Sequence, residues 1–353
     1  MSRSRRAFLA AGLGAAALRG GPPAAPDRAF ARLVDELSGP ETGPTADNLM
    51  SNEDSFPRIA RDLARAAPRG SAYLGVGPDQ NLTYVAHARP ALAFILDHRR
   101  RNLLVHLLHK ALMAVAPDRA GYLARLTARA PARPVGPEAT AEDLVAAFGP
   151  GPVERARLDA AVAEVAAALG PLGVVRDDEW PALATIQARL AGPGLGARFL
   201  ALRMYPTLAR LMTTPARDGR PAHFLAVEAL YRSARDLEGE DRVVPVVGDF
   251  AAAAPLPRLG DRLRRLGLAV GVLYISDVEF FLLRAGRFAA YAENLGRLPW
   301  ADGAVVVRTS TREIDHPDRV AGDGATTVIR PAGRFLADAR AGRIRGVDDL
   351  FRP

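Results

Sequence analysis

Short apolar runs that alternate with helical segments restrict the fold of this chain more than any other feature. Strand-like runs lie at 71–76, 91–96, 242–250, 267–276, 302–310 and, more weakly, 325–331. Helical spacing separates or follows them, for example at 258–266, 278–291 and 334–341. Buried strands that alternate with helices are typical of a parallel sheet covered by helices on both faces. The pattern therefore predicts an α/β fold with a doubly wound, mainly parallel, Rossmann-like sheet.

The long stretch between the second and third strand-like runs is different, because its signals are almost entirely helical. Its helical segments are broken by Gly and Pro clusters at 149–152, 170–171 and 192–194. Such clusters mark loops between helices. We expect a helical insertion over 111–240, an α/β core formed by 45–110 and 241–331, and a C-terminal tail over 332–353.

The first residues carry an export-signal pattern. The run SRRAFL, residues 4–9, matches the twin-arginine motif, an Ala/Gly/Leu stretch follows it, and Ala24-Ala25 offer small residues for cleavage. This predicts a twin-arginine signal peptide over 1–25, the twin-arginine export machinery as a partner, and a periplasmic or extracellular location. An ordinary basic helix is the alternative. No later apolar run reaches the roughly 18–20 residues of a spanning helix, so we expect no transmembrane segment in the mature chain.

The formal charge of +8 raises the question of nucleic-acid binding. Lys110 is the only lysine, and the arginines are interleaved with acidic residues, as in Arg61-Asp62 and Asp241-Arg242. Basic patches interleaved with aromatic residues, which mark nucleic-acid platforms, do not occur. We therefore expect no nucleic-acid partner. The motifs that follow the strand-like runs favour a small-molecule ligand instead.

The chain has no cysteine, which excludes disulfides, thiolate metal sites and a cysteine nucleophile. His106 and His109 share a helix face, but no carboxylate stands at ligand spacing and no His-Glu-x-x-His motif occurs. We expect no metal site. The Gly-x-Ser-x-Gly motif of many serine hydrolases and the Walker phosphate loop are also absent from the sequence.

Polar motifs follow the strand-like runs at the positions where ligands bind in open parallel sheets. The first run ends in Gly75-Val76-Gly77, and glycine lets backbone amides approach a ligand closely. The second ends at Asp97, about 20 residues on, where an acid can accept hydrogen bonds from ribose hydroxyls. Gln80 replaces the third glycine of a dinucleotide fingerprint. The alternative is a tight turn followed by an exposed acid.

The order of these motifs resembles that of class I, S-adenosylmethionine-dependent methyltransferases. In that fold the first strand carries glycines, the second ends in an acid for ribose, and the third often ends in an acid near adenine. The resemblance implies S-adenosylmethionine as a cofactor. Its expected contacts are Gly75, Gly77, Gln80, Asn81, Asp97, Asp249 and Phe250. Alternatively, Gln80 and Asn81 cap the helix that follows them.

A closer resemblance is to an uncharacterised bacterial protein family with a methyltransferase-like core. Its successive motifs match SNEDSFPRI, the run from Tyr73 to Leu112, YPTLARLM, VVPVVGDF and LYISDVEFFL in this order, over roughly 45–310. This resemblance implies the fold and the site residues, but no reaction. The chain departs from it at Asp277, where the family usually has Asn, so a role that needs an amide donor is not implied there.

Three carboxylates are candidates for catalysis. Glu53 lies in the dense polar stretch 51–54, which is able to fold over the pocket. Asp277 and Glu279 lie where the fourth strand-like run ends, and we assign them as candidates for a general base. The alternatives are structural: an acidic first turn after a helix cap in 51–54, and a capping box formed by Ser276 and Glu279.

The substrate-binding candidates lie near these positions. They are Asn52, Tyr84, Arg99, Arg100, Tyr205 and Ser276. An arginine of the 99–101 cluster pairs with Asp97 or holds an anionic substrate, and a solvated basic turn is the alternative. Tyr205 contributes if the helical insertion closes over the pocket.

Three functions remain open at the level of sequence. The first is a methyltransferase-like enzyme that uses S-adenosylmethionine, or a relative that kept only the nucleoside site. The second is a non-catalytic exported protein that binds a small metabolite on the same scaffold. The third is an acid–base hydrolase or isomerase that uses Glu53, Asp277 or Glu279. Export counts against the first, because that cofactor is not expected outside the cytoplasm.

Overall fold

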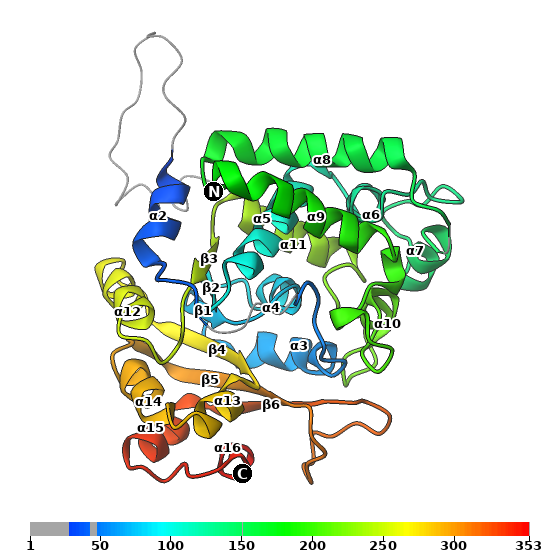
Figure 1. Cartoon of the computed structure of the whole chain (residues 1–353). Helices are drawn as coiled ribbons and strands as arrows, with labels where there is room; N and C mark the ends of the chain where they lie inside the picture. The colour runs from blue at the N-terminus through cyan, green and yellow to red at the C-terminus, as the bar shows by residue number, and fades with distance from the viewer. Residues whose placement is uncertain (1–27, 43–47, 150, 353) are drawn as a thin grey trace.

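The six-stranded sheet has the order β3-β2-β1-β4-β5-β6 (Figure 1). The computed structural model describes residues 28–42, 48–149 and 151–352, so the predicted signal peptide over 1–25 lies outside the described residues. The strands are β1 (Ala72–Gly75), β2 (Leu92–Asp97), β3 (Val243–Val247), β4 (Val270–Ser276), β5 (Trp300–Ser310) and β6 (Thr326–Pro331). Neighbouring strands are parallel except β5 and β6, which are antiparallel. The expected mixed α/β fold with a mainly parallel sheet is confirmed, and each strand-like run overlaps a strand.

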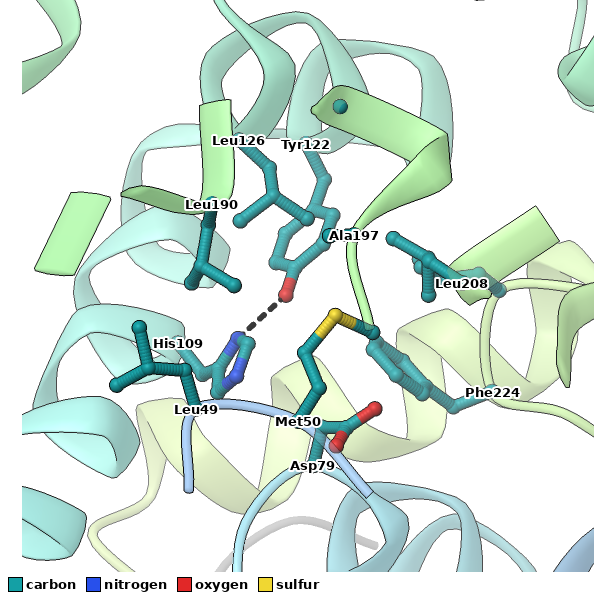
Figure 2. A pocket seen from close by; sticks show the side chains of 12 residues that line it. Leu49, Met50, Asp79, His109, Tyr122, Leu126, Leu190, Ala197, Leu208 and Phe224 are labelled. Atoms are coloured by element: carbon teal, nitrogen blue, oxygen red, sulfur yellow. Dashed lines mark hydrogen bonds between the residues drawn. The ribbon is translucent and has the colours of Figure 1, made fainter. Parts of the chain in front are cut away.

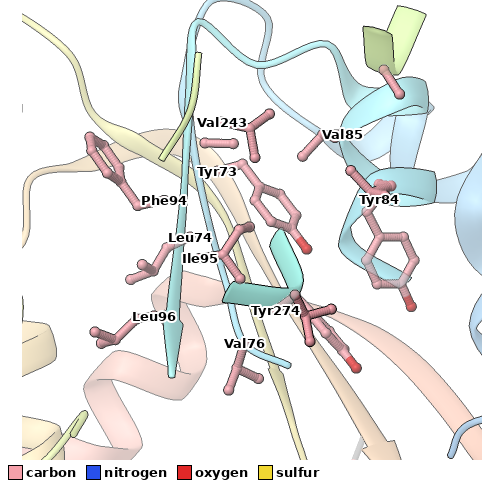
Figure 3. Close-up of a cluster of buried hydrophobic side chains, with 14 of the residues drawn as sticks. Tyr73, Leu74, Val76, Tyr84, Val85, Phe94, Ile95, Leu96, Val243 and Tyr274 are labelled. Carbon is pink, nitrogen blue, oxygen red and sulfur yellow. The ribbon is translucent and has the colours of Figure 1, made fainter. Parts of the chain in front are cut away.

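The strands β1, β2 and β3 are buried along their whole lengths, as expected for parallel strands covered on both faces. Side chains alternate between the two faces of the sheet. Leu74 and Phe94 point to one face, and Tyr73 and Tyr274 point to the other (Figure 3). β3 is an edge strand, which is where Pro245 is tolerated, because a proline cannot donate a backbone hydrogen bond.

Helices cover both faces, which makes the fold compatible with a Rossmann-like arrangement (Figure 1). The face of Tyr73 and Tyr274 is covered by α3 (Phe56–Ala66), α4 (Gln80–Ala88), α5 (Arg100–Val115) and α11 (Glu228–Gly239). The other face is covered by α12 (Pro255–Arg265), α14 (Phe288–Gly296) and α15 (Ala332–Arg340). α2 (Ala29–Leu37) packs beside β3, while α13 (Val278–Arg284) and α16 (Val347–Phe351) pack against each other after β4.

The segment between β2 and β3 is helical, as predicted. Between α5 and α11 it contains α6 (Arg119–Thr127), α7 (Ala141–Ala147), α8 (Arg155–Leu169), α9 (Trp180–Ala191) and α10 (Leu208–Thr213), with short 3₁₀ turns at Gly170–Leu172, Asp177–Glu179, Gly194–Gly196 and Phe199–Ala201. Thr140 and Asp143 form a capping box at the start of α7. These helices pack together on one side of the sheet (Figure 1).

The strand order reverses between β1 and β4. One series runs from β1 outward through β2 to β3, and the other runs from β4 through β5 to β6. In α/β proteins, ligands bind beyond the carboxyl ends of the strands at such a switch point. The loops after β1 and β4 are therefore where a site is expected.

Among the helices of the described residues, none is long and apolar enough to cross a membrane.

Candidate functional site

The carboxylate of Glu53 lies buried against the carboxyl ends of β4 and β5. The residue is 1% exposed. Its Oε1 accepts hydrogen bonds from the hydroxyls of Tyr274, at 2.7 Å, and Ser276. Its Oε2 accepts one from the hydroxyl of Thr309 at 2.6 Å. We call these four residues the Glu53 cluster.

Local structure explains why these side chains meet. Tyr274 and Ser276 stand two positions apart near the carboxyl end of β4, and both hydroxyls donate to Glu53. Glu53 precedes α3 in a segment that is tied down on both sides. The amide of Ser51 donates to Asp79 Oδ1 at 2.7 Å, and Asp54 accepts from the amides of residues 324 and 325 between β5 and β6. The polar stretch 51–54 thus lies across the loops that follow β1, β4 and β5.

Burial controls the protonation of the carboxyl groups in this region. It raises the pKa of Glu53 from 4.5 to about 7, against the opposing effect of the hydrogen bonds from Ser276, Thr309 and Tyr274. Burial also raises the pKa of Asp277, the residue after Ser276. A carboxyl group that titrates near neutral pH is suited to accept and return a proton.

The backbone of Ser276 adopts an unusual conformation. Its φ is +53°, a left-handed value that is uncommon for a residue with a side chain. The pairing of β4 with β5 also shifts register between Tyr274 and Ser276. Ser276 therefore stands on a sharp turn between β4 and α13, although the glycines that usually flank a nucleophile at such a turn are absent.

A cavity of about 290 Å³ opens beside this turn. Ser276, Asp277 and Thr309 line it where β4 and β5 end, and Leu350 and Phe351 of α16 also line it. Glu53 itself does not line the cavity, but two of its hydrogen-bond donors do. A molecule in the cavity would contact Ser276, whose hydroxyl donates a hydrogen bond to the Glu53 carboxylate.

The glycines after β1 accommodate side chains of the chain itself. A Cβ on Gly75 would stand 2.1 Å from Asn81 Oδ1, and a Cβ on Gly77 would stand 2.8 Å from Gln80 Nε2. Asn81 Nδ2 donates to the carbonyls of residues 76, 77 and 78 at 2.9–3.0 Å, and its Oδ1 accepts from Tyr73 at 2.8 Å. The space that the sequence assigned to a cofactor is filled by Asn81 and Gln80.

Gln80 joins this loop to the Glu53 cluster. Its Nε2 donates to the Tyr274 hydroxyl at 3.0 Å, and that hydroxyl donates in turn to Glu53. Tyr84 packs its ring against that of Tyr274 at 5.0 Å, and its buried hydroxyl has no hydrogen-bond partner in the described part of the chain. Gln80 and Tyr84 therefore belong to the surroundings of the Glu53 carboxylate.

The two acids predicted to bind a nucleoside already have partners within the protein. Asp97 accepts two hydrogen bonds at 2.8 Å from the guanidinium of Arg99, in a bidentate pair with little exposure. Asp249 accepts from Arg287 and from the amide of residue 251. Phe250 is buried and packs edge-on against Tyr291. The Asp97–Arg99 pair was one of the alternatives left open by the sequence.

Glu279 is also occupied, by a buried ion pair. Its carboxylate accepts hydrogen bonds from Arg308 and, at 3.0 Å, from the Tyr291 hydroxyl. The side chains of Glu279 and Arg308 are both 2% exposed, and the guanidinium lies 4.0 Å from the ring centroid of Phe335. This geometry is that of a buried ion pair, which was not among the alternatives for Glu279, and the general-base role that we predicted for it stays a prediction.

The other predicted substrate contacts divide into near and distant positions. Asn52 is half-buried next to Glu53 and makes no hydrogen bond with another described residue. Arg100 instead pairs with Glu179 of the helical insertion at 2.7 Å. Tyr205 packs against Phe199, with ring centroids 4.8 Å apart, and is not part of the Glu53 cluster.

A second, much smaller cavity lies where the helical insertion covers the loop after β1 (Figure 2). Its volume of about 20 Å³ has room for about one water molecule. Asp79 and His109 line it among apolar side chains, and His109 Nδ1 lies 2.6 Å from the Tyr122 hydroxyl. Burial lowers the pKa of His109 to about 3, so this histidine is neutral. The cavity is too small to hold a substrate.

Tyr274 and Thr309 were not among the site residues predicted from the sequence. A signal for Tyr274 was present, because it stands two residues before Ser276 near the end of an expected strand. Thr309 lies near the end of the neighbouring strand β5. Neither position could be joined to Glu53 without the order of the strands.

The chain matches the profile of a known protein family. A profile described as a domain of unknown function (DUF7790) matches residues 49–141 and 197–341, which together make up more than half of the chain. The matched ranges contain every strand of the sheet and all four residues of the Glu53 cluster. The unmatched stretch between them falls within the helical insertion. No curated protein matches the chain.

Proposed function

The chain belongs to the DUF7790 family, a domain of unknown function, and on this premise we propose that it is a hydrolase with Ser276 as nucleophile and Glu53 as general base. The observation that carries the proposal is the hydrogen bond from Ser276 Oγ to the buried Glu53 carboxylate at the wall of the 290 Å³ cavity. A nucleophile whose proton already points to a base is the arrangement that covalent catalysis requires. The raised pKa of Glu53 suits that base to neutral pH.

The reaction that follows is acyl transfer to water. Ser276 Oγ attacks the carbonyl carbon of an ester or amide in the cavity, and its proton passes to Glu53. Because Glu53 does not line the cavity, the later proton transfers require the Ser276 side chain to turn so that Glu53 Oε1 faces the cavity. The bond from the acyl carbon to the leaving group then breaks as the leaving group takes that proton. A water molecule gives its proton to Glu53 and attacks the acyl-serine. The serine leaves as its hydroxyl, with the proton returned by Glu53.

The remaining groups position the base. Tyr274 and Thr309 donate to the two oxygens of Glu53, which fixes the plane of the carboxylate. Gln80 in turn holds the Tyr274 hydroxyl. Asp277 lies at the cavity wall, and its charge helps to keep the pKa of Glu53 high.

Labelling with a fluorophosphonate tests this proposal without knowledge of the substrate. We expect the wild-type protein to gain one adduct by intact mass spectrometry, and Ser276→Ala to gain none. Ser310→Ala is the matched control, because Ser310 lines the same cavity and does not contact Glu53, so it should label like the wild type. A wild-type protein that stays unlabelled, or a Ser276→Ala protein that labels equally, would rule out the serine nucleophile.

S-adenosylmethionine binding is the second candidate function. The observation in its favour is the strand order, with glycines after β1, an acid after β2, and an antiparallel strand at the β5 edge. The occupied glycine loop and the Asp97–Arg99 pair count against it, since both must open to admit a nucleoside. Calorimetric titration with S-adenosylmethionine and S-adenosylhomocysteine decides the matter. Binding that is lost in Asp97→Asn supports this candidate, and no detectable heat removes it.

Export by the twin-arginine route also remains a proposal, and it rests on residues 1–25. A hydrolase needs no co-substrate other than water, so it is better suited to a periplasmic or extracellular location than an enzyme that needs a cytoplasmic cofactor. Cell fractionation provides the test. Wild-type protein found outside the cytoplasm, with an R5K/R6K variant retained inside, supports export, whereas cytoplasmic wild-type protein contradicts it.

A further inference from the structure

Two arginines line the cavity beside Ser276 without an acidic partner. They are Arg284 of α13 and Arg312 of the segment after β5. Both are exposed, and within the described residues neither forms an ion pair. Many arginines of this chain have such partners, including Arg58 with Asp323 and Arg287 with Asp249. Unpaired guanidinium groups at a cavity that also holds a candidate nucleophile call for a physical explanation.

The ring of Phe280 contacts both guanidinium groups. The central carbon of the Arg312 guanidinium lies 4.3 Å from the ring centroid of Phe280, and that of Arg284 lies 5.4 Å from it. Phe280 and Arg284 stand four positions apart on α13, so they share a helix face. Stacking on an aromatic ring favours both cations and limits their motion, while the hydrogen-bond donors at their edges stay available.

The charges of the cavity lining favour an anion. Arg308 also lines the cavity, but its charge is neutralised by Glu279 in the buried pair. What remains is the positive charge of Arg284 and Arg312 against the single carboxylate of Asp277. Ser310 and Thr311 line the same cavity, and the Ser310 hydroxyl binds the backbone N–H and carbonyl of Arg312.

We propose that Arg284 and Arg312, stacked on Phe280, bind the anionic group of the substrate, a carboxylate or a phosphate. Planar guanidinium groups match both anions through paired N–H donors. The inference rests on the proposed hydrolase, and it narrows the substrate class to small anionic esters or amides. A cavity of about 290 Å³ suits a metabolite of modest size.

Binding of simple anions to the full chain tests this site apart from catalysis. The probes are inorganic phosphate, followed by ³¹P line broadening, and acetate, followed by ¹H saturation transfer. The test variant is Arg284→Gln/Arg312→Gln. The matched control is Arg155→Gln/Arg157→Gln, which removes two exposed arginines of α8 in the helical insertion. Each single variant and a thermal melt of every protein show whether the fold is kept.

The expected result is binding of at least one anion to the wild type and to the control, at least about tenfold weaker in Arg284→Gln/Arg312→Gln, because charge-assisted hydrogen bonds are lost. The anion that binds more tightly identifies the source as phosphate or carboxylate. Ser276→Ala should bind as the wild type does, which separates this site from the nucleophile. Absence of binding to the wild type, or equal weakening in both double variants, overturns the inference even if Ser276 is labelled by the fluorophosphonate.

Discussion

Burial and hydrogen bonding act in opposite directions on Glu53. Loss of water raises the pKa of its carboxyl group, and three hydroxyl donors lower it, so that the resulting pKa is about 7. At this pKa the carboxylate is half-ionised at neutral pH. The same residue therefore has to satisfy two demands, a stable buried network and a base that can take up a proton.

Glu53→Gln tests the raised pKa through stability. A pKa that rises on folding, from 4.5 to about 7, favours the folded state below pH 4.5, and this contribution is lost as the pH rises through 7. As the pH rises between these limits, the free energy of unfolding of the wild type should fall by about 3 kcal/mol relative to that of Glu53→Gln. Urea denaturation over a pH series measures this difference.

Glu293→Gln, at an exposed position, is the control for that series and should follow the wild type at every pH. Other buried acids, such as Asp79 and Glu238, also contribute to the pH dependence of stability. Because all three proteins contain them, their contributions cancel when the proteins are compared. A constant stability difference between the wild type and Glu53→Gln across this pH range would contradict the raised pKa.

Individual elements are held in place by polar side chains that the sequence associated with ligands. Asn81 binds the carbonyls of the loop between β1 and α4, and the Glu279–Arg308 pair connects α13 to β5. In both cases the polar groups satisfy other groups of the protein. Their role is to set the positions of the loops that surround Ser276.

Gly75→Ala tests whether the loop after β1 is filled by the protein. The added Cβ would lie within 3 Å of Asn81 and Tyr73, so we expect a loss of about 1–3 kcal/mol in the free energy of unfolding. Gly136→Ala is the control, because nothing lies within 4 Å of its added Cβ. Chemical denaturation of the two variants gives the answer, and equal stability would mean that the loop is open.

Arg308→Met tests the structural role of the buried pair. Removal of one partner leaves the Glu279 charge uncompensated, which typically costs about 3–5 kcal/mol. Replacement of both, as Glu279→Met/Arg308→Met, should restore much of this loss, since two apolar groups leave no buried charge. Thermal and urea denaturation show the order of stability of the wild type, the single variant and the double variant. If the double variant is no more stable than Arg308→Met, the charge itself is not the cause.

At the scale of the whole molecule, the sequence predicted the elements better than their contacts. The strands were predictable because buried parallel strands are continuous apolar runs. Glu53 was selected from the polar density of 51–54, but its donor Thr309 lies 256 positions further along the chain. Such a contact depends on the strand order, and neither periodicity nor spacing encodes that order directly.

The residues predicted to bind a nucleoside make contacts with residues that are close to them in the sequence. Asp97, Gly75 and Gly77 were placed correctly at strand ends, as the motif indicates. Their partners, Arg99, Asn81 and Gln80, stand only a few positions away. A motif describes residue types and spacing, whereas the question of whether a loop binds a ligand or its own side chains depends on side-chain conformation.

The central claim is that Glu53 activates Ser276, and the pH dependence of fluorophosphonate labelling tests it most directly. The base acts in its ionised form, so the labelling rate of the wild type should rise with pH through a midpoint of about 7. Glu53→Gln should label far more slowly and without that midpoint. A labelling rate that is independent of pH around 7, or that is unchanged in Glu53→Gln, would contradict the account.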